Sequence, residues 1–151
     1  LATHHFYDNL TFHRVVSQFV IQAGDPRSLN GGDTSGTPAN GNDGPGYVIP
    51  DEYAQNAAIF TQGCVAMANK SAANTTGSQF FICTTDDSSK LTASYNWFGR
   101  VASGIDIAQQ IQQGDVIQSI TVQYQKTGIP GIYPITPTVS PVPTATPTPA
   151  Q

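Results

Sequence analysis

The chain is poor in charged residues, and those it has are scattered. Only 11% of its 151 residues are charged, and the six basic residues form no cluster. Proteins that bind nucleic acid carry a basic patch or stripe, so no nucleic-acid partner is expected. No apolar run approaches the ~20 residues that span a bilayer, so we predict no transmembrane segment. The length is enough for one domain with a core.

The first residues lack the features of a complete amino terminus. The chain does not begin with Met, and no charged start is followed by an apolar stretch, so no signal peptide is visible. Residues 1–8 have the pattern of a helix end that runs into a turn. We therefore expect that the beginning of the domain is missing.

Cysteine is rare as well. Cys64 and Cys83 are the two cysteines, and both lie inside apolar runs. Buried free thiols are the expected state, and a disulfide between them is the alternative.

Short strand patterns dominate the middle of the chain. Residues 11–22 are rich in β-branched and aromatic residues, which predicts a strand broken near Ser17. Other segments with strand character are 59–67, 79–84 and 95–101. Many short strands and few helices favour a closed or nearly closed β architecture.

The remaining segments predict a loop, a helix and a last strand. Residues 24–46 hold seven of the 14 glycines and three prolines, which is typical of a loop. Residues 103–114 predict a short helix with Ser103 as its cap and Gly114 at its end. Residues 116–124 alternate in the manner of a strand.

Residues 127–151 differ in character from everything before them. They contain seven prolines and no charged residue. We interpret residues 1–126 as the folded domain and 127–151 as a Thr/Pro-rich linker or tail in extended polyproline conformation. The alternative is a ragged terminus without a role. Low charge, abundant small polar residues and this tail favour an exported or cell-envelope protein, with a cytoplasmic location as the alternative.

Two motifs carry most of the functional information. The first is Phe12-His13-Arg14-Val15-Val16, which continues to Gly24-Asp25, and the second runs from Met67-Ala68-Asn69 to Gly77-Ser78-Gln79-Phe80-Phe81-Ile82. They place one arginine, two amides and several apolar side chains on neighbouring strand-like segments. The motifs contain no evident nucleophile, acid/base pair or metal set, and His4-His5 without a third ligand is weak evidence for a metal. The inventory suits a reaction in which no covalent bond is made or broken.

These motifs resemble those of the cyclophilins, the peptidyl-prolyl cis-trans isomerases, from about Phe6 to Tyr124. The resemblance implies a mainly β fold: an eight-stranded, closed antiparallel β-barrel with capping helices. In that family two strands and most of a helix precede the point where this chain starts, so we expect the opening strands to be absent. The resemblance implies no cofactor.

The same resemblance implies roles for individual residues. Arg14 is the expected catalytic residue, with Gln22 orienting it and His13 contacting substrate or packing the site. The residues expected to bind the substrate are Phe19, Met67, Ala68, Asn69, Gln79, Phe81, Leu91 and Tyr95. The predicted function is acceleration of X-Pro bond rotation in folding or unfolded polypeptides. The alternatives are a proline-peptide binding module without turnover and a surface-displayed structural domain.

Some positions depart from the family pattern. Lys90 stands where many members carry a tryptophan that is linked to strong cyclosporin binding, so we expect weak binding of that drug. Tyr95 replaces a histidine of many members, and the segment Lys70–Thr76 is one residue longer than the common form. Trp97 is predicted to belong to the core. Proline-containing peptides and unfolded proteins are the expected partners, and a monomer is the expected state.

Overall fold

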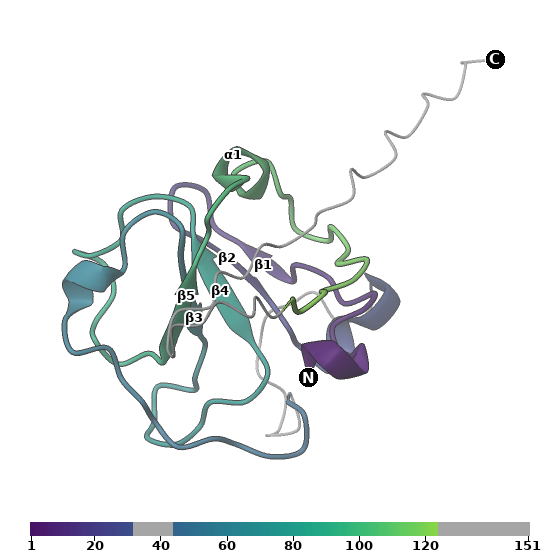
Figure 1. Cartoon of the computed structure of the whole chain (residues 1–151), viewed down its shortest axis with the longest axis horizontal. Helices are drawn as coiled ribbons and strands as arrows, with labels where there is room; N and C mark the ends of the chain where they lie inside the picture. The colour runs from purple at the N-terminus through teal and green to yellow at the C-terminus, as the bar shows by residue number, and fades with distance from the viewer. Residues whose placement is uncertain (32–43, 124–151) are drawn as a thin grey trace.

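The computed structural model describes residues 1–31 and 44–123, in which five β-strands form one antiparallel sheet (Figure 1). The strands follow the order β1-β2-β4-β3-β5 across the sheet. Their bounds are Arg14–Val15 for β1, Val20–Ala23 for β2, Cys64–Met67 for β3, Phe80–Cys83 for β4 and Trp97–Arg100 for β5. The helices are α1, Ile105–Ala108, and three short 3-10 helices: η1, Ala2–His4; η2, Pro26–Gly31; and η3, Ala57–Ile59.

The prediction of a mainly β fold is confirmed. The predicted break near Ser17 is also present, because a tight turn joins β1 to β2 and the Val16 N–H donates to the Val20 carbonyl over 2.9 Å. Within the described residues, β1 and β5 are the two outer strands of the sheet. Closure into a barrel therefore stays a prediction.

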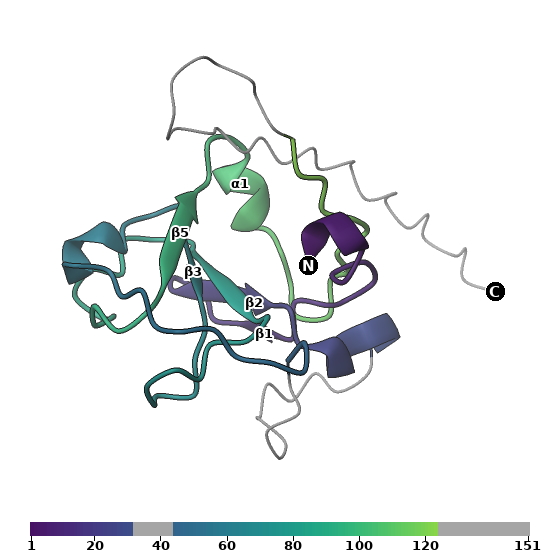
Figure 2. The same cartoon turned by 60° about the horizontal axis from the view of Figure 1, so that its bottom comes forward.

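The two faces of the sheet bury separate apolar clusters, because successive side chains of a strand point to opposite faces. One cluster contains Ile21 and Phe80 and is covered by residues of the amino-terminal segment, α1 and residues 111–120. The other contains Val20 and Phe81 and is covered by residues 54–60 and 91–95. In both overall views η1 lies on the β1 side of the sheet and η3 on the β5 side (Figures 1 and 2).

The predicted helix and last strand are shorter than expected. The regular helix spans only Ile105–Ala108, and its N-cap is Gly104, with φ 81°, instead of Ser103. Beyond Gly114 a single bridge joins Thr11 to Val116, and no regular strand forms in the described residues up to 123. Ile117 is buried and Val116 is exposed, so the alternating pattern gives neither a full ladder nor regular alternation of burial. Residues 124–151, and with them the predicted tail, lie outside the described residues.

Trp97 is not a core residue, contrary to the prediction. Its side chain is 42% exposed on β5, and the neighbouring Phe98 is 52% exposed. β5 pairs on one side only, with β3, so its other side has no strand to cover these rings within the described residues.

Cys64 and Cys83 are buried free thiols, as expected. They lie on the facing strands β3 and β4. Contact with Cys64, reinforced by burial, raises the pKa of Cys83, so this thiol stays protonated.

Candidate active site

Arg14 faces the expected partners across the first hairpin. It is directly opposite Gln22 in the antiparallel pairing of β1 with β2, and its Nη1 donates to the Gln22 Oε1 over 3.4 Å. The turn between the strands returns the Phe19 ring to within 5.9 Å of the Arg14 guanidinium carbon, which is cation–π distance. Among the described residues no carboxylate forms an ion pair with Arg14. The guanidinium is therefore held in place and retains its donors for a ligand.

A cluster of apolar side chains, the predicted proline slot, lies on the same face of the sheet as this arginine. Phe81 on β4 is opposite Gln22 on β2, which places it on the same face of the sheet as Arg14. Its ring is 4% exposed and packs edge-on against Tyr95, with 5.3 Å between the ring centroids. The partly buried residues that pack against this cluster include Phe19, Ala68, Leu91 and Tyr95. The structure thus brings together most of the apolar residues that the sequence singled out.

Met67 is not brought to this face. It is opposite Phe80 in the pairing of β3 with β4, whereas its neighbour Ala66 is opposite Phe81. Because side chains alternate along a strand, Met67 and Phe81 point to opposite faces of the sheet. Val20, which follows Phe19, is buried in the same cluster as Phe81.

A chain of hydrogen bonds leads from Arg14 into the protein. Gln22 Nε2 donates to Gln79 Oε1 over 2.8 Å, and Gln79 Nε2 donates to Asp25 Oδ2 over 3.2 Å. Asp25 is 1% exposed and forms an ion pair with Arg27, with 2.8 Å between Oδ2 and Nη2. Asp25 ends the first sequence motif, and no role was predicted for it. A carboxylate directly after an apolar strand and a glycine was the signal that could have revealed it.

Gly24 allows this chain of contacts to form. Its φ is +95°, and a Cβ atom added there would lie 2.5 Å from the Ser78 carbonyl oxygen. Ser78 in turn donates from Oγ to the Gly24 carbonyl over 2.7 Å. Only glycine combines this φ with such a close approach, so the end of β2 can run directly against the segment that carries Gln79.

His13 is buried beneath the site. It is 1% exposed, and neither ring nitrogen has a hydrogen-bond partner among the described residues. Burial lowers the pKa of His13, and the nearby Asp25 carboxylate opposes this shift only in part. A neutral, buried imidazole fits the expected packing role, and its burial leaves little surface for contact with a substrate.

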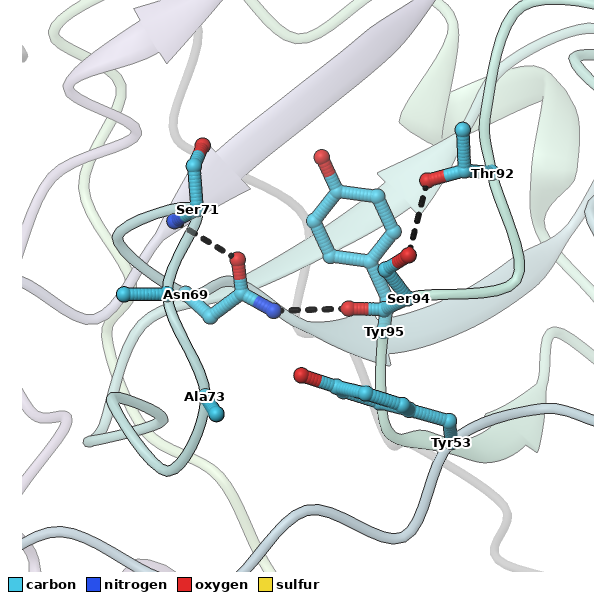
Figure 3. Close-up of a pocket in the computed structure, with 8 residues that line it drawn as sticks. Tyr53, Asn69, Ser71, Ala73, Thr92, Ser94 and Tyr95 are labelled. Carbon is cyan, nitrogen blue, oxygen red and sulfur yellow. Dashed lines mark hydrogen bonds between the residues drawn. The ribbon is translucent and has the colours of Figure 1, made fainter.

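Asn69 offers its backbone, while its side chain is already occupied. Its Nδ2 donates to the Ser94 carbonyl over 2.7 Å, and its Oδ1 accepts from the Ser71 N–H over 3.1 Å (Figure 3). Its own N–H and C=O form no hydrogen bond within the described part of the chain. The Ala68 N–H, by contrast, donates to the Gln79 carbonyl over 2.8 Å. Asn69 therefore provides the free backbone edge beside the slot.

Lys90 is tied to the rim of the slot. Its Nζ donates to Asp87 Oδ1 and to the Gln18 carbonyl, each over 2.8 Å, and lies 5.5 Å from the centroid of the Phe19 ring. Asp87 is completely buried. Phe19 is thus flanked by two cations, Arg14 and Lys90, and Lys90 ties the β1–β2 turn to the loop before Leu91.

The described residues contain no group of three His, Cys, Asp or Glu side chains that could hold a metal ion. No helix in this part of the chain has the length and apolar character to cross a membrane.

Comparison with known proteins identifies the class to which this fold and site belong. Residues 1–129 match the family of cyclophilin-type peptidyl-prolyl cis-trans isomerases, and the chain is a member of that family. It is 38% identical over 123 residues to peptidyl-prolyl cis-trans isomerase B of Bacillus subtilis. The aligned residues cover 82% of this chain and 77% of the relative. It is also 38% identical over 122 residues to a peptidyl-prolyl cis-trans isomerase of Helicobacter pylori. Here the aligned residues cover 80% of this chain and 67% of the relative.

Solved structures agree with this assignment. A cyclophilin-type isomerase of Cryptosporidium parvum, crystallised in the presence of the dipeptide Ala-Pro, superimposes with a TM-score of 0.56 at 25% identity. The match covers 79% of this chain and 74% of the other. The prediction of a peptidyl-prolyl isomerase is therefore confirmed at the level of the family and its reaction.

Proposed function

We propose that Arg14 is the catalytic residue and that it stabilises the twisted X-Pro amide of folding or unfolded polypeptides. Rotation of this bond breaks amide resonance and has a barrier of ~18–20 kcal/mol. A ~10⁵-fold acceleration requires only about 7 kcal/mol of preferential binding to the twisted state. Electrostatic stabilisation and a dry slot can supply that amount without a nucleophile or a proton transfer.

The guanidinium acts on the charge that appears during rotation. As the amide twists, its nitrogen becomes pyramidal and gains a lone pair, which a fixed donor stabilises more than it stabilises the planar amide. The contact of Arg14 with Gln22 and its position over the Phe19 ring support this role. Arginine is permanently charged and presents its donors in a rigid plane, so it remains a donor at every physiological pH.

The slot and the free backbone edge hold the rest of the substrate. The proline ring packs between Phe19, Phe81 and Leu91, and the Asn69 N–H and C=O pair with the peptide backbone. Support comes from the apolar cluster on this face and from the unused backbone groups of Asn69. Recognition of the backbone and the proline ring explains how one site can serve many polypeptides.

Further proposals concern partners and location. Lys90 is engaged with Asp87 at the rim, where many family members have a tryptophan, so cyclosporin binds weakly. The protein acts as a monomer.

Its composition supports an exported or cell-envelope location, which immunodetection in fractionated cells tests directly.

The experiment that tests the catalytic role compares wild type with Arg14→Ala in a proline-peptide isomerisation assay. The kcat/KM of the variant should fall by at least ~100-fold, the typical effect of removing a transition-state donor. Arg100→Gln serves as the control for loss of one positive charge, because Arg100 lies on the outer strand β5 and contacts Thr61 and backbone carbonyls. Equal rates for wild type and Arg14→Ala would overturn the mechanism. Normal peptide affinity of the wild type without any rate enhancement would instead show a binding module.

A further inference from the structure

A cavity adjoins the predicted proline slot. It has a volume of about 250 Å³ and is lined by Tyr53, Asn69, Ser71, Ala72, Ala73, Thr92, Ser94 and Tyr95. Tyr95 borders both places, because its ring also packs edge-on against Phe81 in the slot. Asn69 borders both as well, since it follows Ala68 and offers its free backbone edge. A peptide that pairs with Asn69 therefore passes the mouth of this cavity.

The walls of the cavity are fixed before any ligand binds. The Asn69 side chain connects the wall formed by residues 69–73 to the wall formed by residues 92–95, through Ser71 on one side and Ser94 on the other (Figure 3). Asp51 and Asn74 exchange two hydrogen bonds, of 2.6 Å and 3.0 Å, and so tie the segment next to Tyr53 to the end of the same loop. Binding therefore orders little of the protein, which favours affinity and selectivity.

The size of the cavity selects its occupant. Sites for small molecules usually measure ~300–1,000 Å³, so 250 Å³ suits a single side chain with its water better than a separate ligand. In an extended peptide, alternate side chains lie on the same face about 7 Å apart. A side chain two positions from the proline is therefore the one that reaches past Tyr95 into the cavity.

The lining selects the chemistry of that side chain. None of the eight lining residues is charged, and five carry hydroxyl groups: Tyr53, Ser71, Thr92, Ser94 and Tyr95. Hydroxyl groups both donate and accept, as a carboxamide does. Tyr53, Ser71, Thr92 and Ser94 are exposed, so these hydroxyl groups meet a side chain at the surface. A charged side chain gains no opposite charge from this lining, and an aliphatic side chain gains no hydrogen bond from it.

We propose that this cavity is a specificity subsite for an amide side chain, glutamine or asparagine, two residues away from the substrate proline. The inference rests on the proposed function, since it concerns the substrate of the same groove. The longer segment 70–76 forms one wall of the subsite through Ser71, Ala72 and Ala73. The feature that sets this loop apart in the sequence thus becomes a determinant of substrate choice.

The test uses the full-length protein and a set of proline peptides that carry Ala, Gln, Leu, Glu or Lys at one position two residues before or after the proline. The kcat/KM for the Gln peptide should exceed that for the Ala peptide by about tenfold at one of these positions, the effect of one or two net hydrogen bonds. Tyr53→Phe and Ser71→Ala should each reduce this ratio by about threefold or more, mainly through KM. Tyr47→Phe, which alters an exposed tyrosine outside the cavity, is the matched control and should keep the ratio.

Two results would overturn the subsite. One is equal kcat/KM for all peptides of the set, and the other is a preference for glutamine that both variants retain. In either case turnover of the Ala peptide would leave the proposed isomerase mechanism standing. Absence of turnover with every peptide would contradict the mechanism as well.

Discussion

The side-chain amide of Gln79 donates a hydrogen bond to the carboxylate of Asp25, with 3.2 Å between Nε2 and Oδ2. An ionised carboxylate can only accept, so Gln79 must turn its nitrogen toward Asp25 and its oxygen toward Gln22. Gln22 then donates to that oxygen over 2.8 Å and presents its own oxygen to Arg14. A buried carboxylate therefore sets the direction of two amides and places an acceptor beside Arg14.

The first prediction concerns this direction. Asp25→Asn keeps the shape of the side chain but adds a donor, so Gln79 and Gln22 can reverse and turn an N–H group toward Arg14. We expect kcat to fall about tenfold, the equivalent of one hydrogen bond, with KM little changed. Asp106→Asn, at an exposed acid of α1, is the control. An unchanged kcat in folded Asp25→Asn, checked by circular dichroism, would show that Asp25 does not position the arginine.

The sequence contained most of this site but not its connections. The two motifs contain Arg14, Gln22, Gln79 and Phe81, and the resemblance to the cyclophilins supplied their expected roles. The link through Asp25 depends on the pairing of β2 with β4, which joins residues more than 50 positions apart. Such register is a tertiary property, and no local pattern revealed it.

The dependence on tertiary contacts also explains where the predictions of the fold were wrong. Alternation predicted a strand at residues 116–124, but regular strands require a partner along their length, and within the described residues only Thr11 bridges to Val116. Trp97 is apolar and lies in a strand, yet it is half exposed because β5 is an outer strand in the described sheet. Whether a side chain is buried depends on which other residues pack against its segment. The sequence of the segment alone does not determine those residues.

A second prediction concerns Gly24. Gly24→Ala combines an unfavourable φ of +95° with a Cβ atom 2.5 Å from the Ser78 carbonyl oxygen. We expect a loss of roughly 2–4 kcal/mol in the free energy of unfolding, measured by urea denaturation. Gly114→Ala is a matched control, since its φ is +96° and no atom lies within 4 Å of the added carbon. If the two variants lost equal stability, the close approach at Gly24 would not matter.

The pH dependence of stability should report the burial of His13. Burial lowers the pKa of His13 in the folded protein, whereas the unfolded chain titrates near the ordinary value of about 6.5. Below that pH the unfolded state binds the proton more readily, so the free energy of unfolding falls as the pH decreases through about 6.5 toward the lowered native pKa. The slope reaches at most about 1.4 kcal/mol per pH unit.

Urea denaturation between about pH 5.5 and 7.5 measures this slope. His13→Gln should remove most of it in that range, whatever the variant does to stability at neutral pH. His4→Gln, at an exposed histidine, should leave it unchanged. A slope that persists in His13→Gln would assign the effect to another group.

A fourth prediction concerns the pair of Lys90 and Asp87. Asp87 is fully buried, and its Oδ2 has no hydrogen-bond partner within the described residues. Its Oδ1 accepts from the Thr85 hydroxyl and from the Lys90 ammonium, which is its partner of opposite charge. Lys90→Met should lower the free energy of unfolding by about 1–3 kcal/mol, less than for a fully buried pair because the lysine side chain is 47% exposed. Adding Asp87→Asn should restore part of this loss, and a double-mutant cycle with additive effects would show that the two residues do not interact.

In the proposed mechanism the rigid cationic plane of Arg14 binds the twisted amide more tightly than the planar amide. The most direct test is Arg14→Lys, which keeps the charge and loses the plane of donors. NMR exchange on a bound proline peptide measures both its Kd and its rate of cis–trans interconversion on the protein. We expect a Kd within about threefold of wild type and an interconversion rate at least ~10-fold lower. An interconversion rate equal to that of wild type at unchanged Kd would contradict the proposed mechanism.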